Sequence, residues 1–333
     1  MDKSNVEKPF SNQLLLQFVT LFVCATFLLA TPPAQTEDLV IKGQDGWLFP
    51  VWESLTDANK PSIDANIGII NAFKKQLAEK NIQLLTLVVP MKASFYPDRM
   101  PPHKPISAEI MNRYAYVMDG LQAAGIGTVN VASVLHAQER DGRHAFFRTD
   151  YHWTAQAAEA SAVATAEKIN QQVRFDKEPK GGSELGEWVN VRRYGDLAMR
   201  FMTAEQRVLL KRDVFRVRDQ PKTSMSLLDD NPDEVHVVGN SFVQPYLGFP
   251  QKLSETLNRP VSLTWKPGNV GPWATMLQYL ESDEFLQNKP KVILWQLNEP
   301  RMYSGPDAVN VWDTESLMKA ETWFSRVVAA ISR

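Results

Sequence analysis

Two short stretches of the sequence carry side chains that could perform nucleophilic chemistry. "FRTDYHWT" places Asp150 and His152 two positions apart, and "VVGNSFV" places Ser241 directly after an apolar run. A serine hydroxyl becomes an effective nucleophile when an imidazole takes its proton, and a carboxylate fixes the tautomer of that imidazole. In an extended segment, side chains two residues apart point to the same side. We therefore predict a triad in which His152 contacts Asp150 through one ring nitrogen and Ser241 through the other.

Each motif also has a simpler interpretation. Ser241 could merely cap a strand-to-helix turn, because the Gly-x-Ser-x-Gly pattern of α/β-hydrolases is absent. Asp150 and His152 could form an ordinary surface pair or half of a metal site. A metal site needs at least one more ligand, and no metal-ligand spacing is found among the remaining histidines, His103, His136, His144 and His236. We expect neither a metal nor a cofactor.

The elements that must position these side chains alternate along the chain. Hydrophobic spacing predicts helices near residues 66–81, 107–124, 154–173, 247–257, 272–280 and 314–331. Thr154 can cap the N-terminus of the third of these helices. Apolar runs predict strands near residues 82–90, 127–132, 234–240, 261–265 and 291–297. The strand at 82–90 is apolar on both faces, which is typical of a parallel sheet covered on both sides. The sequence thus predicts an α/β sandwich, with Ser241 at the carboxyl end of a strand, where such sheets bind ligands.

Further polar residues follow other predicted strands. Asn269, in "WKPGNVGPW", could donate its amide to an oxyanion, and "WQLNEPRMY" places Glu299 and Arg301 at the same edge of the sheet. Residues 174–234 are polar and weakly periodic, which indicates a hairpin or irregular insertion rather than a second domain. Insertions of this kind often wall an active-site cleft.

Composition and charge exclude several classes of protein. With 333 residues, 44% of them apolar, the chain can bury one large core. The formal net charge of −2 and the lack of a basic block argue against nucleic acid as a partner. Cys24 is the only cysteine, so the sequence downstream of it can form no disulfide within itself and no cysteine-based zinc site.

The N-terminus predicts export from the cytoplasm. The run from Leu14 to Ala30 is free of charge and mostly apolar, at a length between that of a signal peptide and that of a spanning helix. Residues 1–36 are therefore interpreted as a signal peptide or an uncleaved membrane anchor. A buried helix of a cytosolic domain would normally show a polar face. Residues 37–333 are expected to form one domain that contains the insertion at 174–234.

Several motifs in a fixed order resemble one family. "GQDGWLF", "VVPMKASFYPDRMP", "RTDYHWT", "VVGNSF" and "WQLNEPR" follow one another as in the periplasmic alginate O-acetyltransferases, which are SGNH-hydrolase-like proteins that work beside membrane-bound O-acyltransferases. The resemblance covers residues 42–301. In ordinary SGNH esterases the serine precedes the Asp/His pair. Here the pair comes first, and one residue separates its two members. This permuted order is that of the acetyltransferase branch.

The resemblance implies a fold, a mechanism and partners. It makes the protein an SGNH-like, three-layer O-acetyltransferase in which Ser241 is the nucleophile, His152 the general base and then acid, and Asp150 the orienting carboxylate. It implies a periplasmic location, a secreted polysaccharide as acceptor, a membrane-bound O-acyltransferase as acetyl supplier, and other polysaccharide-export proteins as partners. Asn240 and Phe242 flank the serine where the alginate enzymes have Thr and Tyr. The resemblance therefore does not identify the oxyanion donors or the glycan.

Substrate contacts and alternative functions follow from the same residues. Trp153 could stack on a sugar ring or belong to the core, and Asn240 could help to hold the oxyanion. Guanidinium groups bind carboxylates in a bidentate manner, so uronate sugars could be held by Arg148, Arg192, Arg193 or Arg301. A carbohydrate acetylesterase would use the same triad with water as acceptor, and a non-catalytic scaffold of polysaccharide export could keep the same fold.

Overall fold

The computed structural model describes residues 39–219 and 234–333. The segment Asp38–Arg333 forms one compact unit. The predicted signal peptide or anchor, including Cys24, lies outside the described residues. Over the two described ranges, no helix has both the length and the apolar character needed to cross a membrane.

Five parallel strands form the central sheet, in the order β4-β3-β9-β7-β8. They are β3 (Gln83–Val89), β4 (Gly127–Val129), β7 (Val235–Gly239), β8 (Val261–Trp265) and β9 (Val292–Asn298). In the centre of the sheet β7 lies directly beside β9, with Val238 opposite Trp295. The loops that follow these two strands therefore emerge side by side at the carboxyl edge of the sheet.

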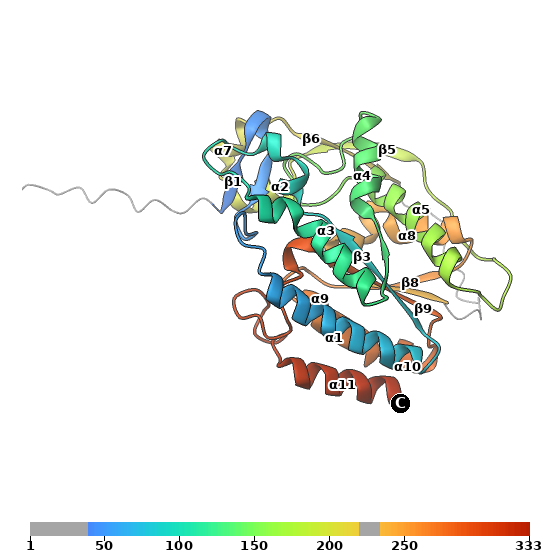
Figure 1. Ribbon diagram of the computed structural model, residues 1–333. Coiled ribbons are helices and arrows are strands. Elements are labelled where there is room, and N and C mark those ends of the chain that lie inside the picture. The colour runs from blue at the N-terminus through green and yellow to red at the C-terminus, as the bar shows by residue number, and fades with distance from the viewer. Residues whose placement is uncertain (1–38, 220–233) are drawn as a thin grey trace, which may run out of the picture. The chain divides into compact units, whose positions relative to one another are not determined.

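Helices cover both faces of the sheet (Figure 1). One face packs against α1 (Lys60–Ala78), α3 (Ala108–Ala123), α9 (Gly271–Leu280), α10 (Asp283–Gln287) and α11 (Ala320–Ser332). The other face packs against α4 (Val131–Arg140), α5 (Ala155–Gln172) and α8 (Phe249–Leu257). In β3, Leu84 and Val88 join the first core and Leu85, Leu87 and Val89 join the second. The predicted three-layer α/β sandwich is confirmed.

Capping residues explain where the helices begin. The predicted cap of α5 is confirmed, since Ala157 donates its backbone N–H to Thr154 Oγ1 at 3.2 Å. The strand expected over 127–132 ends early, because Asn130 accepts a hydrogen bond from the backbone of Ser133 at 3.1 Å and so starts α4. The C-terminal helix begins at Ala320, later than the spacing predicts.

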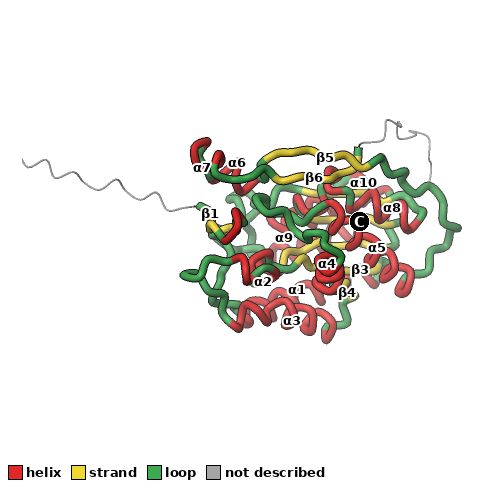
Figure 2. Tube along the Cα trace, turned by 90° about the horizontal axis from the view of Figure 1, so that it is seen from above, coloured by secondary structure: helices red, strands yellow, loops and turns green. Residues whose placement is uncertain are grey.

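The insertion packs onto the main core rather than forming a core of its own. It contains β5 (Trp188–Arg193), α6 (Asp196–Phe201), α7 (Ala204–Val208) and β6 (Asp213–Arg218), and β5 and β6 pair antiparallel. Phe215 and Val217 of β6 join the core that covers α5 and α8. Figure 2 shows this hairpin along one side of the molecule, with α6 and α7 at one end.

Three short elements that the sequence did not reveal complete the fold. A hairpin of β1 (Val40–Lys42) and β2 (Leu48–Pro50) packs Val40 and Leu48 against Leu197 and Ala198 of α6. The helix α2 (Lys92–Phe95) follows β3. Together they bring the start of the described chain against the insertion.

A buried ion pair joins α3 to the end of β9. The side chains of Arg113 and Glu299 are fully buried, and Arg113 Nε donates to Glu299 Oε1. Glu299 Oε2 also accepts the backbone N–H of Met91 at 2.7 Å. Glu299, which the sequence placed at the edge of the sheet with Arg301, thus faces the interior and fixes the turn that begins α2.

Removing the cation should destabilise the fold more than removing both partners. We expect Arg113→Met to lower the free energy of unfolding by about 3–5 kcal/mol, because Glu299 would remain as an unpaired buried charge. The double variant Arg113→Met/Glu299→Gln should recover much of this loss, since the amide still accepts from Met91. Urea denaturation measures both, with the exposed Arg140→Met as control. Equal losses in the single and double variants would contradict this account.

Candidate active site

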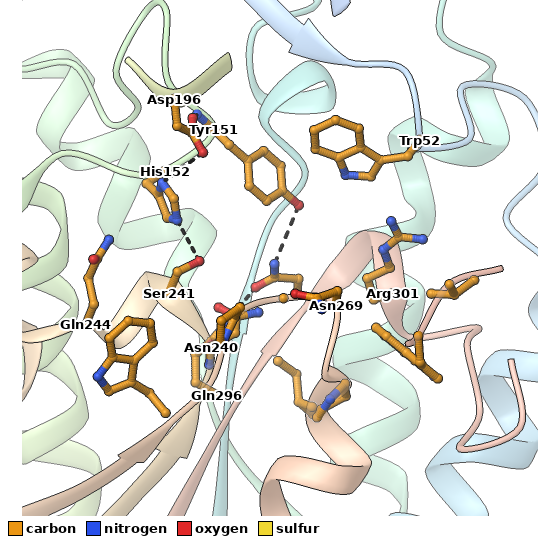
Figure 3. A pocket seen from close by; sticks show the side chains of 18 of the residues that line it. Trp52, Tyr151, His152, Asp196, Asn240, Ser241, Gln244, Asn269, Gln296 and Arg301 are labelled. Carbon is orange, nitrogen blue, oxygen red and sulfur yellow. Dashed lines mark hydrogen bonds and ion pairs between the residues drawn. The ribbon is translucent and has the colours of Figure 1, made fainter. Parts of the chain in front are cut away.

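The structure brings the three predicted triad residues together, and Figure 3 shows His152 and Ser241 facing each other. Ser241 Oγ lies 2.7 Å from His152 Nε2, and His152 Nδ1 lies 2.7 Å from Asp150 Oδ1. Asp150 and His152 are only 5% and 9% exposed. Because the alcohol, the imidazole and the carboxylate form one hydrogen-bonded chain, the arrangement can deprotonate Ser241 for attack on an acyl group.

The turn after β7 presents Ser241 and its amide. Ser241 is the first residue of a short 3₁₀ helix (Ser241–Val243), so its backbone N–H has no acceptor within that helix. Asn240 shapes the turn: its Oδ1 accepts the N–H of Phe242 at 3.0 Å, and its own N–H donates to Gln296 Oε1 at 3.0 Å. The amide of Ser241 is thereby available to an oxyanion.

The loop that carries Asp150 and His152 is fixed by several hydrogen bonds. Asp150 Oδ1 accepts the N–H of His152 at 2.9 Å, and Asp150 Oδ2 accepts the N–H of Asp196 at 2.8 Å. The buried Lys92 also contacts this loop: its Nζ donates hydrogen bonds to the carbonyl oxygens of Leu48, Arg148 and Asp150 at 2.8, 3.0 and 2.8 Å. Lys92 therefore joins β2 to the catalytic loop and limits its movement.

The insertion approaches the catalytic loop very closely. Gly195 donates its N–H to Thr149 Oγ1 at 2.9 Å, and Thr149 donates this hydroxyl to Asp213 Oδ2 at 2.7 Å. A Cβ on residue 195 would lie 2.4 Å from the Cβ of Asp150. Only glycine permits this contact, so the sequence of the insertion is tied to the geometry of the triad.

Burial and the neighbouring charges have opposite effects on the pKa values of Asp150 and His152. Burial would raise the pKa of Asp150, but the hydrogen bonds and the charge of His152 hold it well below its usual value. Burial also opposes protonation of His152, yet the hydrogen bond and charge of Asp150, with the charge of Asp196, raise the pKa of His152. The site thus favours the charged imidazolium that forms during acyl transfer.

Asp196 is a second carboxylate at the imidazole. Its Oδ2 lies 3.8 Å from His152 Nδ1, and its Oδ1 accepts the N–H of Tyr151 at 2.7 Å. Burial and the neighbouring Asp150 raise the pKa of Asp196 to about 6. Asp150, His152 and Asp196 are close enough to hold a cation, but both nitrogens of His152 are already hydrogen-bonded. The arrangement therefore fits proton transfer better than metal ligation.

A pocket of about 670 Å³ opens over the triad. Its walls combine aromatic, amide and basic side chains, among them Trp52, Trp265, Gln244, Asn298, Arg193, Arg200 and Arg301. The insertion supplies Arg193 and Arg200, and the segment after β9 supplies Arg301. The pocket is thus built by the sheet edge and the insertion together.

The remaining predicted residues divide between the pocket and the core. Asn240, Asn269, Arg193 and Arg301 line the pocket, and Asn269 donates from its amide to Asp313 Oδ2 at 3.2 Å.

Of the two interpretations open for Trp153, the structure selects the core position: the side chain is 0% exposed and donates its indole N–H to the carbonyl of Phe242 at 2.8 Å. Trp153 therefore supports the nucleophile turn and does not contact a sugar. Arg148 does not line the pocket and pairs with Asp213 at 3.3 Å.

Sequence reasoning missed several residues of the site. Asp196 and Arg200 lie in the weakly patterned insertion, and Trp52 follows the unpredicted β2. Lys92 was visible only as part of the "MKASF" motif. Its burial, which is rare for a lysine without a specific set of acceptors, became visible only in the structure.

This combination of fold and site defines an SGNH-type acyl-transfer enzyme. The family model described as the SGNH hydrolase-like domain of the acetyltransferase AlgX matches residues 40–299. The chain belongs to this acetyltransferase family, which confirms the resemblance drawn from its motifs.

Individual relatives support the same assignment. A Pseudomonas fluorescens protein named probable alginate O-acetylase AlgJ is 27% identical over 269 residues, which are 78% of this chain and 67% of that protein. The alginate biosynthesis protein AlgX of Pseudomonas aeruginosa is 25% identical over 271 residues, covering 77% of this chain and 55% of AlgX. The solved O-acetyltransferase domain of Pseudomonas putida AlgJ has a TM-score of 0.71 at 25% identity, covering 88% of this chain and 99% of that domain.

The charge of Asp196 should influence the pKa of His152, the general base. In Asp196→Asn the acceptor for Tyr151 is kept but a negative charge near His152 is lost, so the pKa of His152 should fall. The acidic limb of the kcat/KM profile should then move to lower pH, and kcat should drop on the order of tenfold. Hydrolysis of an aryl acetate measures both, with the exposed Asp119→Asn as control. An acidic limb that does not move would show that Asp196 has no electrostatic role.

Proposed function

We propose that this protein transfers acetyl groups to hydroxyls of an acidic, alginate-like exopolysaccharide through an acetyl-Ser241 intermediate. The observation that carries the proposal is the continuous chain from Ser241 Oγ to His152 and Asp150, with both distances at 2.7 Å. The names of the relatives, which include probable alginate O-acetylase AlgJ, support the choice of polymer.

In the first step the serine takes the acetyl group. His152 Nε2 accepts the proton of Ser241 as Oγ attacks the acetyl carbonyl of the donor. The tetrahedral oxyanion is held by the amide of Ser241, with Asn269 as a second candidate donor in the same pocket. His152 then gives the proton to the leaving group, and Asp150 stabilises the transient imidazolium.

In the second step a sugar hydroxyl replaces the donor. The hydroxyl loses its proton to His152 Nε2 and attacks the acetyl-serine, and the collapsing intermediate returns the proton to Ser241. Transfer exceeds hydrolysis only if the sugar is held against the intermediate more effectively than water. Trp52 and Trp265, which line the pocket, offer aromatic faces for this purpose in place of Trp153.

The basic side chains of the pocket support an acidic acceptor. Arg193, Arg200 and Arg301 all line it, and each guanidinium can bind a uronate carboxylate with two parallel hydrogen bonds. Arg193 is also stacked 4.1 Å from the centre of the Phe215 ring, which restricts its orientation. A neutral polysaccharide would leave these cations without a role.

The proposed location is the periplasm, with residues 1–36 acting as a signal peptide or as an inner-membrane anchor. The apolar run from Leu14 to Ala30 supports export. An acyl donor delivered by a membrane-bound O-acyltransferase, together with other polysaccharide-export proteins, completes the proposed set of partners. No cofactor is required by the two-step mechanism.

The nucleophile assignment is tested by a single substitution. Purified protein should release nitrophenol from an aryl acetate, and Ser241→Ala should lower this rate by roughly 10³-fold or more. The reason is that, among the residues that the structure describes, Ser241 is the only one with a hydroxyl hydrogen-bonded to His152. Ser133→Ala, at an exposed position of α4, serves as the matched control. Equal rates for Ser241→Ala and the control would remove Ser241 as the nucleophile.

Acceptor identity separates a transferase from an esterase. Mass spectrometry of reactions containing an aryl acetate and mannuronate oligosaccharides should show acetylated sugar. Arg301→Gln should raise KM for the oligosaccharide by roughly tenfold while leaving hydrolysis of the aryl acetate unchanged. Neutral glucose oligomers are the control acceptors. If free acetate is the only product with every sugar, the acetylesterase function is supported instead.

A further inference from the structure

The insertion presents apolar and basic side chains to solvent beside the pocket. Val208 and Leu209, at the end of α7, are 77% and 86% exposed. They belong to a set of six exposed residues, three apolar and three basic, that we call the α6–α7 surface: Met199, Val208, Leu209, Arg200, Lys211 and Arg212. Leucine and valine exposed to this degree, next to one another, are not explained by the fold, because they contribute nothing to its core.

The charge of this segment is opposite to that of the whole chain. Residues 199–212 contain four basic residues and one acidic residue, Glu205, whereas the full sequence has a net charge of −2. Lysine and arginine beside exposed apolar side chains are typical of surfaces that bind at the interface of a bilayer with anionic lipids.

The residues on either side of Val208 and Leu209 are fixed by contacts with the rest of the protein. Leu210 packs against the small core that contains Val40 and Leu48. Arg207 donates to the carbonyl of Met202 at 2.7 Å and so ties α7 to the end of α6. Because its neighbours in the chain are anchored, the pair Val208 and Leu209 forms a fixed projection at the end of α7. Figure 2 shows α7 itself at one end of the β5–β6 hairpin.

The described chain begins at the base of this projection. Leu39 is 54% exposed and precedes Val40, which lies in the same small core as Leu197 and packs with Leu210. Leu39 follows Ala30, the end of the predicted signal or anchor run, by nine positions, with eight residues between them. Such a connection spans at most roughly 30 Å when fully extended. If the run acts as the proposed anchor, this length limits how far Leu39 can lie from the membrane.

We propose that the α6–α7 surface docks on a bilayer that contains anionic phospholipids, with Val208 and Leu209 entering the interface and Lys211 and Arg212 contacting the headgroups. Met199 and Arg200 of this surface, and the neighbouring Phe201, also line the pocket. Docking consequently places the mouth of the pocket beside the bilayer. If the proposed function holds, the acetyl group is handed to Ser241 at the membrane surface.

Vesicle binding by the unit Asp38–Arg333 tests this proposal without the N-terminal run. The unit is compact, and the AlgJ acetyltransferase domain was solved as a separate chain. It should sediment with vesicles of phosphatidylethanolamine and phosphatidylglycerol more than with phosphatidylcholine alone, and less as salt is raised. The variant Val208→Asp/Leu209→Asp, and separately Lys211→Glu/Arg212→Glu, should each weaken binding by roughly tenfold or more.

Matched controls and an activity readout make each result decisive. The double variants Met111→Asp/Val309→Asp and Lys75→Glu/Lys80→Glu make changes of the same kind and number at other exposed positions and should bind as the parent does. All variants should hydrolyse the aryl acetate at the parental rate in solution, which shows that the triad and the fold are intact and separates this test from that of the proposed function. Absence of vesicle binding, or equal binding by all variants, would overturn the proposal. Capture of a membrane-bound acyltransferase without binding to lipid would do so too, in favour of a protein partner.

Discussion

The structure depends on keeping one buried carboxylate charged and correctly oriented. Asp150 is almost entirely removed from water, and a buried carboxylate survives only when hydrogen bonds replace its hydration. Both of its oxygens are occupied, one by His152 and one by the backbone of Asp196. The imidazole is thereby fixed in the tautomer that points Nε2 at Ser241, which is the condition for acyl transfer.

Three separate parts of the chain meet to satisfy this condition. Lys92, the first residue of α2, donates hydrogen bonds to carbonyl oxygens of the catalytic loop. Gly195 and Asp196, from the insertion, hold it from the other side. The loop itself has little regular structure, so its precision comes from these neighbours. The insertion is therefore part of the catalytic apparatus as well as a wall of the pocket.

The same insertion links the chemistry to the surroundings of the molecule. Its inner side supplies Arg193 and Arg200 to the pocket, while the end of α7 carries exposed Val208 and Leu209. One short segment thus borders the pocket on one side and solvent on the other. If both proposals hold, it would bring an acidic polymer and a membrane-derived acyl group to the same serine.

The sequence by itself determined the α/β class, most of the helices and strands of the sandwich, and the identity of the triad. These followed from local signals, such as the apolar run of β3, the cap at Thr154 and the Asp-x-His and Gly-x-Ser motifs. It also indicated a polar insertion, but not what that insertion does. Tertiary structure alone decided that Glu299 and Trp153 face the core and that Asp196, Lys92 and Trp52 belong to the site. The physical reason is that capping and periodicity act over a few residues, whereas the partners of Lys92 lie 44 to 58 positions away in the chain. Such contacts form only when packing brings distant segments together, and no local pattern records them.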